Sequence, residues 1–150
     1  ILGLFDQVAA LLVTDGERCI LAHEHRYQNN MWSTLAGFLE PGEDIEHAVR
    51  REVFEETGIA IEPPSLRLVD VMTYAGAGGT AHAIIYNAAC PEGADPVIND
   101  EHLVWRWMPP EAYIARFLAG EMLRARGVPD AAVELAAEVA RVVRRAAGAR

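Results

Sequence analysis

Three glutamates stand close together near the middle of the chain, at Glu52, Glu55 and Glu56, directly after Arg51. They belong to a longer run, from Gly37 to Ile59, in which glycines and charged residues recur at fixed intervals. Clustered carboxylates can bind a divalent cation, and such a cation can in turn bind and polarise phosphate groups. The run therefore predicts metal-dependent chemistry on a phosphorylated ligand.

The residues around the glutamates predict that all three lie on one helix. Pro41 and Gly42 are typical of a turn before it. Asp44 is a favourable N-cap and Gly58 a favourable C-terminal stop. We therefore expect a helix over Ile45–Thr57.

The glutamates take an unusual place on this helix. Counting about 100° per residue, Glu52 and Glu56 fall near the middle of the apolar face and Glu55 along its edge. The opposite side is expected to carry His47, Arg50, Arg51 and Phe54. One interpretation is an ordinary solvated helix face, since acidic residues are rarely buried unless paired. The other is that a dication lies between carboxylates that point inward, which would offset the cost of burying them.

The type of metal follows from the donor atoms. The cluster offers only oxygen ligands and contains neither cysteine nor histidine, which favours Mg²⁺ or Mn²⁺ over Zn²⁺. Magnesium usually keeps several waters and takes further ligands from substrate phosphates. The substrate is therefore expected to be a phosphorylated small molecule.

The whole run resembles the Nudix box. Gly37, five residues, Glu43, seven residues and then Arg-Glu-Val-Phe-Glu-Glu-Thr-Gly-Ile over 51–59 fill every defining position of that signature. Nudix enzymes hydrolyse nucleoside diphosphates linked to another moiety. The resemblance implies an α+β fold, an α/β/α sandwich with a mixed sheet and a catalytic loop-helix-loop. It also implies a Mg²⁺- or Mn²⁺-dependent attack of water on phosphorus in a diphosphate linkage.

Roles in the family can be transferred to matching positions of this sequence. The resemblance implies that the metal ligands are the backbone carbonyl of Ala36 and the carboxylates of Glu52, Glu55 and Glu56. It implies that Arg51 orients the carboxylates by ion pairing, either with Glu55 at i+4 or with Glu43 in the preceding loop. Without the box, Arg51 would be read as a surface arginine.

Two glutamates are candidates for the general base that takes the proton of the attacking water. Glu52 is one. Glu101, in the loop before an expected strand at 103–108, is the other, because many Nudix enzymes use a glutamate from a comparable late loop as base or additional ligand. An exposed turn residue is the alternative interpretation of Glu101.

The substrate class is less well defined. The run 32–43 is similar to the NADH pyrophosphatase branch of the family, but the four-cysteine zinc ribbon of that branch is absent. Residues 71–76 also differ from the branch's downstream Ser-Gln-Pro-Trp-Pro-Phe-Pro signature. We therefore expect a general nucleotide diphosphatase. The alternatives are an NADH or ADP-ribose pyrophosphatase, a non-catalytic Nudix ligand-sensing domain, and a plain structural domain.

Composition sets the broad class. With 150 residues, 51% of them hydrophobic, the chain can bury a core and is expected to form one domain over 1–150. A net charge of −9 disfavours duplex nucleic acid and anionic membranes as partners. Its longest strongly apolar run, 8–13, is too short to span a membrane. Cys19 and Cys90 lack paired spacing and are expected to be buried thiols, which fits the cytoplasm.

The remaining pattern is rich in strands. Strands are expected at 8–13, 19–22, 66–74, 81–88 and 103–108, with hairpin turns at 15–16 and in the glycine-rich 75–79. Further helices are expected at 111–118 and 130–146. The alanine and valine stripe of the last helix can serve a homodimer or dock on the protein's own sheet, and the sequence leaves both open.

Overall fold

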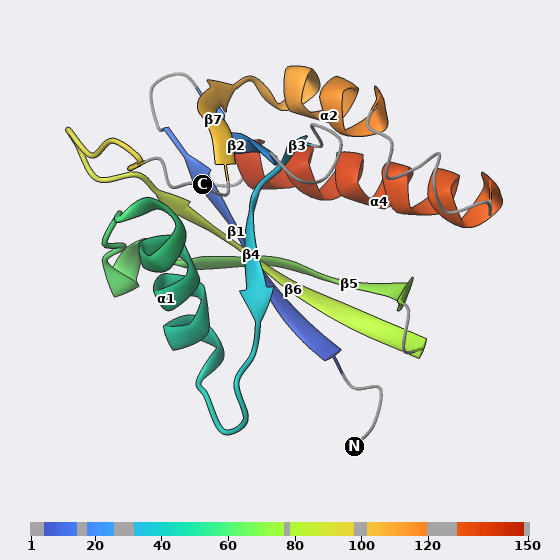
Figure 1. The fold of residues 1–150 in the computed structure, drawn as a ribbon, viewed down its shortest axis with the longest axis horizontal. Coiled ribbons are helices and arrows are strands. Elements are labelled where there is room, and N and C mark those ends of the chain that lie inside the picture. Colours follow the sequence, from blue (N-terminus) through green and yellow to red (C-terminus); the bar gives the residue numbers. More distant parts are fainter. Residues whose placement is uncertain are drawn as a thin grey trace.

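A mixed sheet lies between helices on both of its faces in the computed structural model, which describes residues 5–14, 18–25, 32–76, 79–97, 102–119 and 129–148 (Figure 1). Its strands are β1 (Phe5–Val13), β2 (Ile20–His25), β3 (Trp32–Ser33), β4 (Leu35–Phe38), β5 (Arg67–Gly76), β6 (Gly79–Ala89) and β7 (His102–Met108). The helices are α1 (Ile45–Thr57), a 3₁₀ turn η1 (Pro63–Ser65), α2 (Pro110–Ala119) and α4 (Pro129–Gly148). The arrangement confirms the predicted α+β sandwich.

Strand β1 organises the sheet. It pairs in parallel with β6 along its whole length, while its other edge is shared between two antiparallel partners. Gln7 to Ala10 pair with β4, and Val13 pairs with Ile20 at the start of β2. Strand β4 therefore leads the chain from the sheet directly into the turn before α1.

Alternating residues of β1 supply two separate cores, as expected for a strand buried on both faces. Val8, Ala10 and Leu12 pack in the core that contains the apolar face of α1, formed by Ala48, Val49 and Val53. Leu11 and Val13 pack on the opposite face, in the core shared with residues of α2 and α4. Helix α1 and helices α2 and α4 therefore form the two outer layers (Figure 1).

Helix α4 uses its small apolar residues to cover its own sheet. The buried residues on its described turns are Ala140, Val142, Val143 and Ala146. Ion pairs fix the same helix to neighbouring elements: Arg141 contacts Asp70 of β5 at 2.6 Å, and Arg144 contacts Glu111 of α2 at 2.6 Å. Of the two interpretations of the stripe, the structure shows docking on the sheet.

Most predicted elements form where the sequence placed them, and α1 has the predicted bounds. β1 and β2 are antiparallel neighbours, as are β5 and β6, whereas the turn residues 15–17 and 77–78 lie outside the described part. The sequence did not predict β3, β4 or η1. β3 has only two residues, and the Leu-Ala-Gly-Phe of β4 has weak strand propensity, so pairing with β2 and β1 creates these strands.

Neither cysteine forms a disulfide bond. Cys19 is buried, as predicted, whereas Cys90 is only half-buried. Burial and the nearby Asp95 raise the pKa of the Cys90 thiol. Within the described ranges, no helix has the length and apolar character needed to cross a bilayer.

One buried side chain ties the sheet to the end of α4. The Asn87 amide donates a hydrogen bond of 2.8 Å to the carbonyl oxygen of Ala146, and both residues are buried. The described part of α4 reaches Gly148, so none of its described residues lies four positions after Ala146 to donate to this carbonyl. Asn87 therefore serves as a C-terminal cap supplied by β6.

Replacing Asn87 with Ala should lower the free energy of unfolding by about 1–3 kcal/mol, because a buried carbonyl loses its donor. Asn87→Asp should cost at least as much, since it places a second oxygen against that carbonyl. Urea denaturation measures both. Arg67→Gln on the exposed side of β5 is the control, and equal stability of Asn87→Ala and this control would refute the cap.

Candidate active site

Local capping fixes the register of α1, and with it the directions of the glutamates. The Asp44 carboxylate accepts a hydrogen bond of 3.1 Å from the backbone N–H of His47. At the other end, Gly58 has φ 74°, a left-handed conformation, and its N–H donates to the carbonyl of Phe54 at 2.8 Å. Both predicted caps are confirmed.

Glu52 lies against the backbone of β4. A Cβ atom on residue 37 would overlap the Glu52 carboxylate, so only glycine leaves room for this approach. The Glu52 side chain is only 14% exposed. Burial raises the pKa of Glu52, although hydrogen bonds and charge from Arg51 act in the opposite direction. Gly37 and Arg51 thus hold between them a carboxylate that has lost much of its water.

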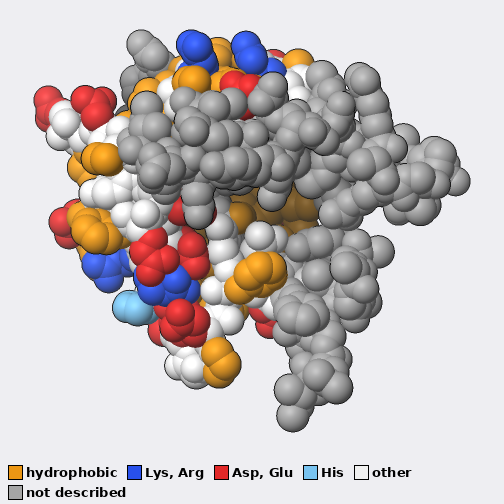
Figure 2. Space-filling view, in the orientation of Figure 1, with side chains coloured by type: hydrophobic (Ala, Val, Ile, Leu, Met, Phe, Trp, Pro, Cys, Tyr) orange, Lys and Arg blue, Asp and Glu red, His pale blue; other side chains and the backbone are white. Residues whose placement is uncertain are grey.

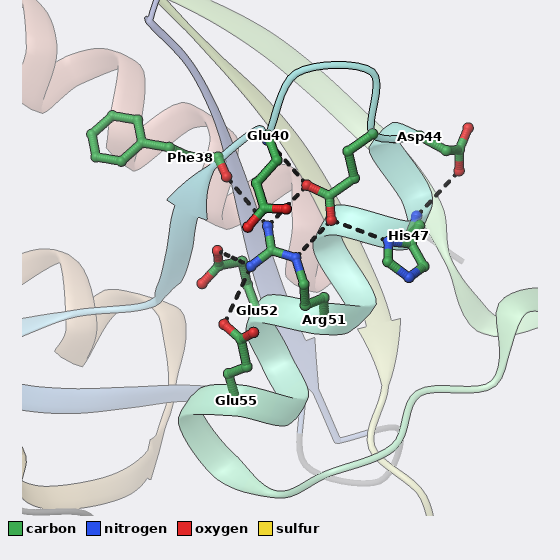
Figure 3. Close-up of polar contacts among 8 residues, drawn as sticks. Phe38, Glu40, Asp44, His47, Arg51, Glu52 and Glu55 are labelled. Atoms are coloured by element: carbon green, nitrogen blue, oxygen red, sulfur yellow. Dashed lines mark hydrogen bonds and ion pairs between the residues drawn. The ribbon is translucent and has the colours of Figure 1, made fainter.

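Arg51 contacts three carboxylates at once (Figure 3). Its Nε and Nη2 donate to Glu43 at 2.6 and 2.9 Å. Its Nη1 donates to Glu52 at 2.8 Å and to Glu55 at 3.2 Å. Nη2 also reaches the carbonyl oxygen of Phe38 at 3.4 Å. One guanidinium therefore joins the loop after β4 to two turns of α1.

Glu43 is the best-satisfied carboxylate of the group. Besides the two bonds from Arg51, it accepts from the backbone N–H of Glu40 at 3.1 Å, and the His47 Nδ1 lies 3.1 Å away. Its side chain is 8% exposed. Hydrogen bonds from Arg51 are the main reason that the pKa of Glu43 falls to about 2. Glu43, the box position in the loop before α1, is thus an anchor for Arg51.

The predicted directions of the box residues are partly confirmed. Glu52 is shielded, and the Oε2 atom of half-buried Glu56 is hidden from solvent, as the inward placement requires. Glu55, at the edge of the face, is 57% exposed, so it does not point into the core. Placing Arg51 on the water side was wrong: its side chain is 19% exposed because it turns back over the carboxylates. His47 and Phe54 are exposed as expected.

Two predicted site residues need separate comment. Ala36 precedes Gly37 in β4 and pairs with Ala9 of β1, which places its backbone in the strand beside Glu52. Glu101 lies outside the described residues. His47 was not predicted to contact the cluster, although its i+4 spacing from Glu43 is the signal that could have identified it.

The carboxylates do not form a ready-made metal cage. Among the described residues, no three histidine, cysteine or acidic side chains are grouped closely enough to hold an ion. Arg51 instead contacts Glu43, Glu52 and Glu55, and one guanidinium cannot balance three ionised carboxylates. The donors are all oxygens and the local charge stays negative, so the residues fit a hard dication in chemical type.

The surface around the cluster is open on one side. Figure 2 shows acidic and basic side chains gathered over α1 and the turn that precedes it, beside a recess with hydrophobic side chains at its floor. Phe38, at the end of β4, is 62% exposed. Trp32 of β3, in contrast, is only 7% exposed, and the Cζ atom of Arg116 lies 4.9 Å from the centre of its ring. Trp32 is thus a core residue.

A mixed sheet between helices, with a carboxylate-bearing loop-helix-loop on one face, defines a Nudix-type α/β/α sandwich. The NUDIX domain profile matches residues 4–129. The chain therefore belongs to the NUDIX domain family, as the box predicted.

Individual proteins support the assignment. Over 58 residues, 37% of this chain, the sequence is 55% identical to Nudix hydrolase 19, chloroplastic, of Arabidopsis thaliana, and covers 13% of that protein. Over 54 residues, 36% of the chain, it is 50% identical to the NAD-capped RNA hydrolase NudC of Stutzerimonas stutzeri, and covers 20% of it. The chain thus spans a fifth or less of these curated relatives.

Solved structures share the fold over a longer stretch. The crystal structure of a MutT NUDIX hydrolase from Burkholderia pseudomallei superposes with a TM-score of 0.62 at 28% identity, over 72% of this chain and 84% of that one. The E. coli dihydroneopterin triphosphate pyrophosphohydrolase gives a TM-score of 0.63 at 20% identity, over 89% of this chain and 95% of that one. The second likeness concerns the fold alone.

The Glu43 contacts predict a pH dependence of stability. Because the pKa of Glu43 is about 2 in the folded protein against an ordinary 4.5, its stabilisation is complete above pH 4.5 and is lost as the pH falls toward 2. Glu52 acts in the opposite sense, since its raised pKa costs stability as the pH rises through its titration. The contribution of Glu43 is therefore isolated by comparing the wild-type protein with a variant that lacks the Glu43 carboxylate.

Between pH 4.5 and 2, the free energy of unfolding should fall more steeply for the wild-type protein than for Glu43→Gln. Urea denaturation at a series of pH values gives both slopes. Glu62→Gln, an exposed glutamate outside the cluster, should keep the wild-type slope. Parallel curves for the wild-type protein and Glu43→Gln would contradict the assignment.

Proposed function

We propose that this chain is a Mg²⁺- or Mn²⁺-dependent Nudix pyrophosphohydrolase that cleaves a diphosphate linkage in a nucleoside diphosphate derivative by attack of water on phosphorus. The observation that carries the proposal is the charge balance around Arg51. Its guanidinium faces Glu43, Glu52 and Glu55, which leaves negative charge that a dication would neutralise. Family membership and a completely filled box agree with it.

The metal would be held by the carboxylates of Glu52, Glu55 and Glu56 and by the backbone carbonyl of Ala36. Exposed Glu55 can turn toward an ion at the helix edge without unpacking the core. When bound, a dication neutralises charge on the phosphate oxygens and lowers the pKa of the attacking water.

The protein's own groups orient the reaction. Arg51 holds Glu52 at 2.8 Å, and Gly37 lets the carboxylate lie against β4, so its position is fixed before substrate arrives. Partial burial makes Glu52 more basic than an ordinary glutamate, which suits a proton acceptor. Glu52 and Glu101 both remain candidates for the general base.

A dinucleotide of the NADH type is the favoured substrate class. Among the curated relatives with about half of the aligned residues identical are a human mitochondrial NAD(P)H pyrophosphatase and the NAD-capped RNA hydrolase already described. ADP-ribose and other nucleotide diphosphates are the alternatives. The net charge of −9 disfavours duplex nucleic acid as a partner. A cytoplasmic location stays a prediction, consistent with cysteines that form no disulfide.

A substrate panel tests the activity. With MgCl₂ or MnCl₂, the protein should convert at least one of NADH, ADP-ribose, dinucleoside polyphosphates or nucleoside triphosphates to a nucleoside monophosphate and a second phosphate product. Chelation with EDTA should abolish turnover. If the folded protein cleaves none of these compounds with either metal, the proposed activity is wrong and a ligand-sensing domain is favoured.

Glu56→Gln should lower turnover at least about 100-fold while the protein stays folded, because the metal that neutralises charge in the transition state would lose one of its carboxylate ligands. Steady-state kinetics and circular dichroism give the two readouts. Glu46→Gln removes an exposed carboxylate from the same helix and should retain wild-type turnover. Equal loss in both variants, or unchanged turnover in Glu56→Gln, would exclude Glu56 as a ligand.

A further inference from the structure

The three carboxylates on Arg51 are not held equally. Glu43 receives two bonds, at 2.6 and 2.9 Å, Glu52 receives one at 2.8 Å, and Glu55 receives one at 3.2 Å. The last two bonds share a single nitrogen, Nη1. Among the three carboxylates, Glu55 therefore has the longest bond to Arg51.

Solvent exposure follows the same order. The side chains of Glu43 and Glu52 are 8% and 14% exposed, whereas Glu55 is 57% exposed. An exposed i,i+4 ion pair contributes little, because water and salt screen it. Opening the contact between Arg51 and Glu55 is thus far less costly than moving either of the other two carboxylates.

Arg51 also occupies the place that suits a cation. Its Nη1 lies within hydrogen-bond distance of both Glu52 and Glu55, two of the residues proposed to hold the metal. A metal ion on the same Glu55 oxygen would lie beside the guanidinium, and the two positive charges would repel each other. Binding of the metal therefore favours a change of partner.

We propose that Arg51 acts as an internal placeholder cation, and that Glu55 exchanges Arg51 for the metal while Glu43 keeps the guanidinium anchored. The inference rests on the proposed metal-dependent function. It assigns different tasks to the three contacts: the bond to Glu55 opens, the bond to Glu52 orients, and the pair of bonds to Glu43 stays closed.

The surroundings of Glu43 keep its two bonds to Arg51 in place. Both of its oxygens bond Arg51, and the Glu40 N–H and the His47 ring hold the carboxylate from the other side. A bidentate, shielded pair is the strong form of this contact. After Glu55 leaves, Arg51 is therefore still fixed beside Glu52 and does not swing into solvent.

Nuclear magnetic resonance of the wild-type protein tests the exchange directly, with MgCl₂ alone as titrant. The side-chain carboxyl resonance of Glu55 should shift on saturation, while the Nε–H resonance of Arg51 stays protected by Glu43. The carboxyl of Glu46 is the internal control and should not move. A Glu55 resonance that stays in place while those of Glu52 and Glu56 shift would overturn the exchange, as would loss of the Arg51 Nε–H signal.

Calorimetry on two charge-matched variants gives a second test. Arg51→Gln removes the placeholder, whereas Arg50→Gln removes the neighbouring arginine, which bonds the carbonyl of Ile61 at 2.9 Å. The dissociation constant for Mg²⁺ should be at least about two-fold lower for Arg51→Gln than for Arg50→Gln. A factor of this size corresponds to the energy of one exposed i,i+4 ion pair, which no longer competes with the metal. Equal or weaker binding would mean that Arg51 only orders the ligands.

The experiments distinguish failure of the Glu55 exchange from failure of the pyrophosphohydrolase activity. If Glu55 exchanges partners in the titration but no nucleotide is cleaved, the exchange stands and the pyrophosphohydrolase activity fails. If the enzyme is active with Mg²⁺ and the Glu55 resonance does not respond, the activity stands and the exchange fails.

Discussion

The organisation of this site depends on one guanidinium placed among more carboxylates than it can neutralise. Arg51 gathers Glu43, Glu52 and Glu55 from a loop and two helix turns, and the shortage of positive charge persists after every contact is made. In water such an excess would be screened, but the partial burial of Glu43 and Glu52 keeps it effective. The fold thus keeps uncompensated negative charge at one edge of α1, and this charge attracts cations.

The rest of the architecture serves to hold that edge still. Strand β1, buried on both faces, carries β4 on one edge, and β4 brings Gly37 under the Glu52 carboxylate. The caps Asp44 and Gly58 then fix the rotation of α1 against the sheet. On the far face, α4 docks through its small residues and its Asn87 cap. Packed elements thus fix the site, and of the three carboxylates bonded to Arg51, Glu55 is the one most exposed to solvent.

Much of this could be read from the sequence because the signals are local. Turn residues, caps and a period of 3.6 set the bounds of α1, and the same period placed Glu52 and Glu56 on the inner side. The direction of Arg51 could not be read this way, because a long side chain can turn back over its helix toward charge. β4 escaped prediction for a related reason, since its pairing with β1 depends on residues far away in the chain. The contact of His47 with Glu43 follows a local rule and could have been found.

The hydrogen bonds described for Arg51 and Glu43 come from one contiguous stretch, 38–55, with Gly37 of β4 beneath it. The carboxylates bonded to Arg51 and the groups that hold them are therefore close together in the chain, and β4 supports them through Gly37. Substitutions elsewhere in the fold can therefore leave these bonds unchanged, because their donors and acceptors all lie within this stretch. A single fold can in this way vary its other surfaces while the acidic group on α1 stays constant.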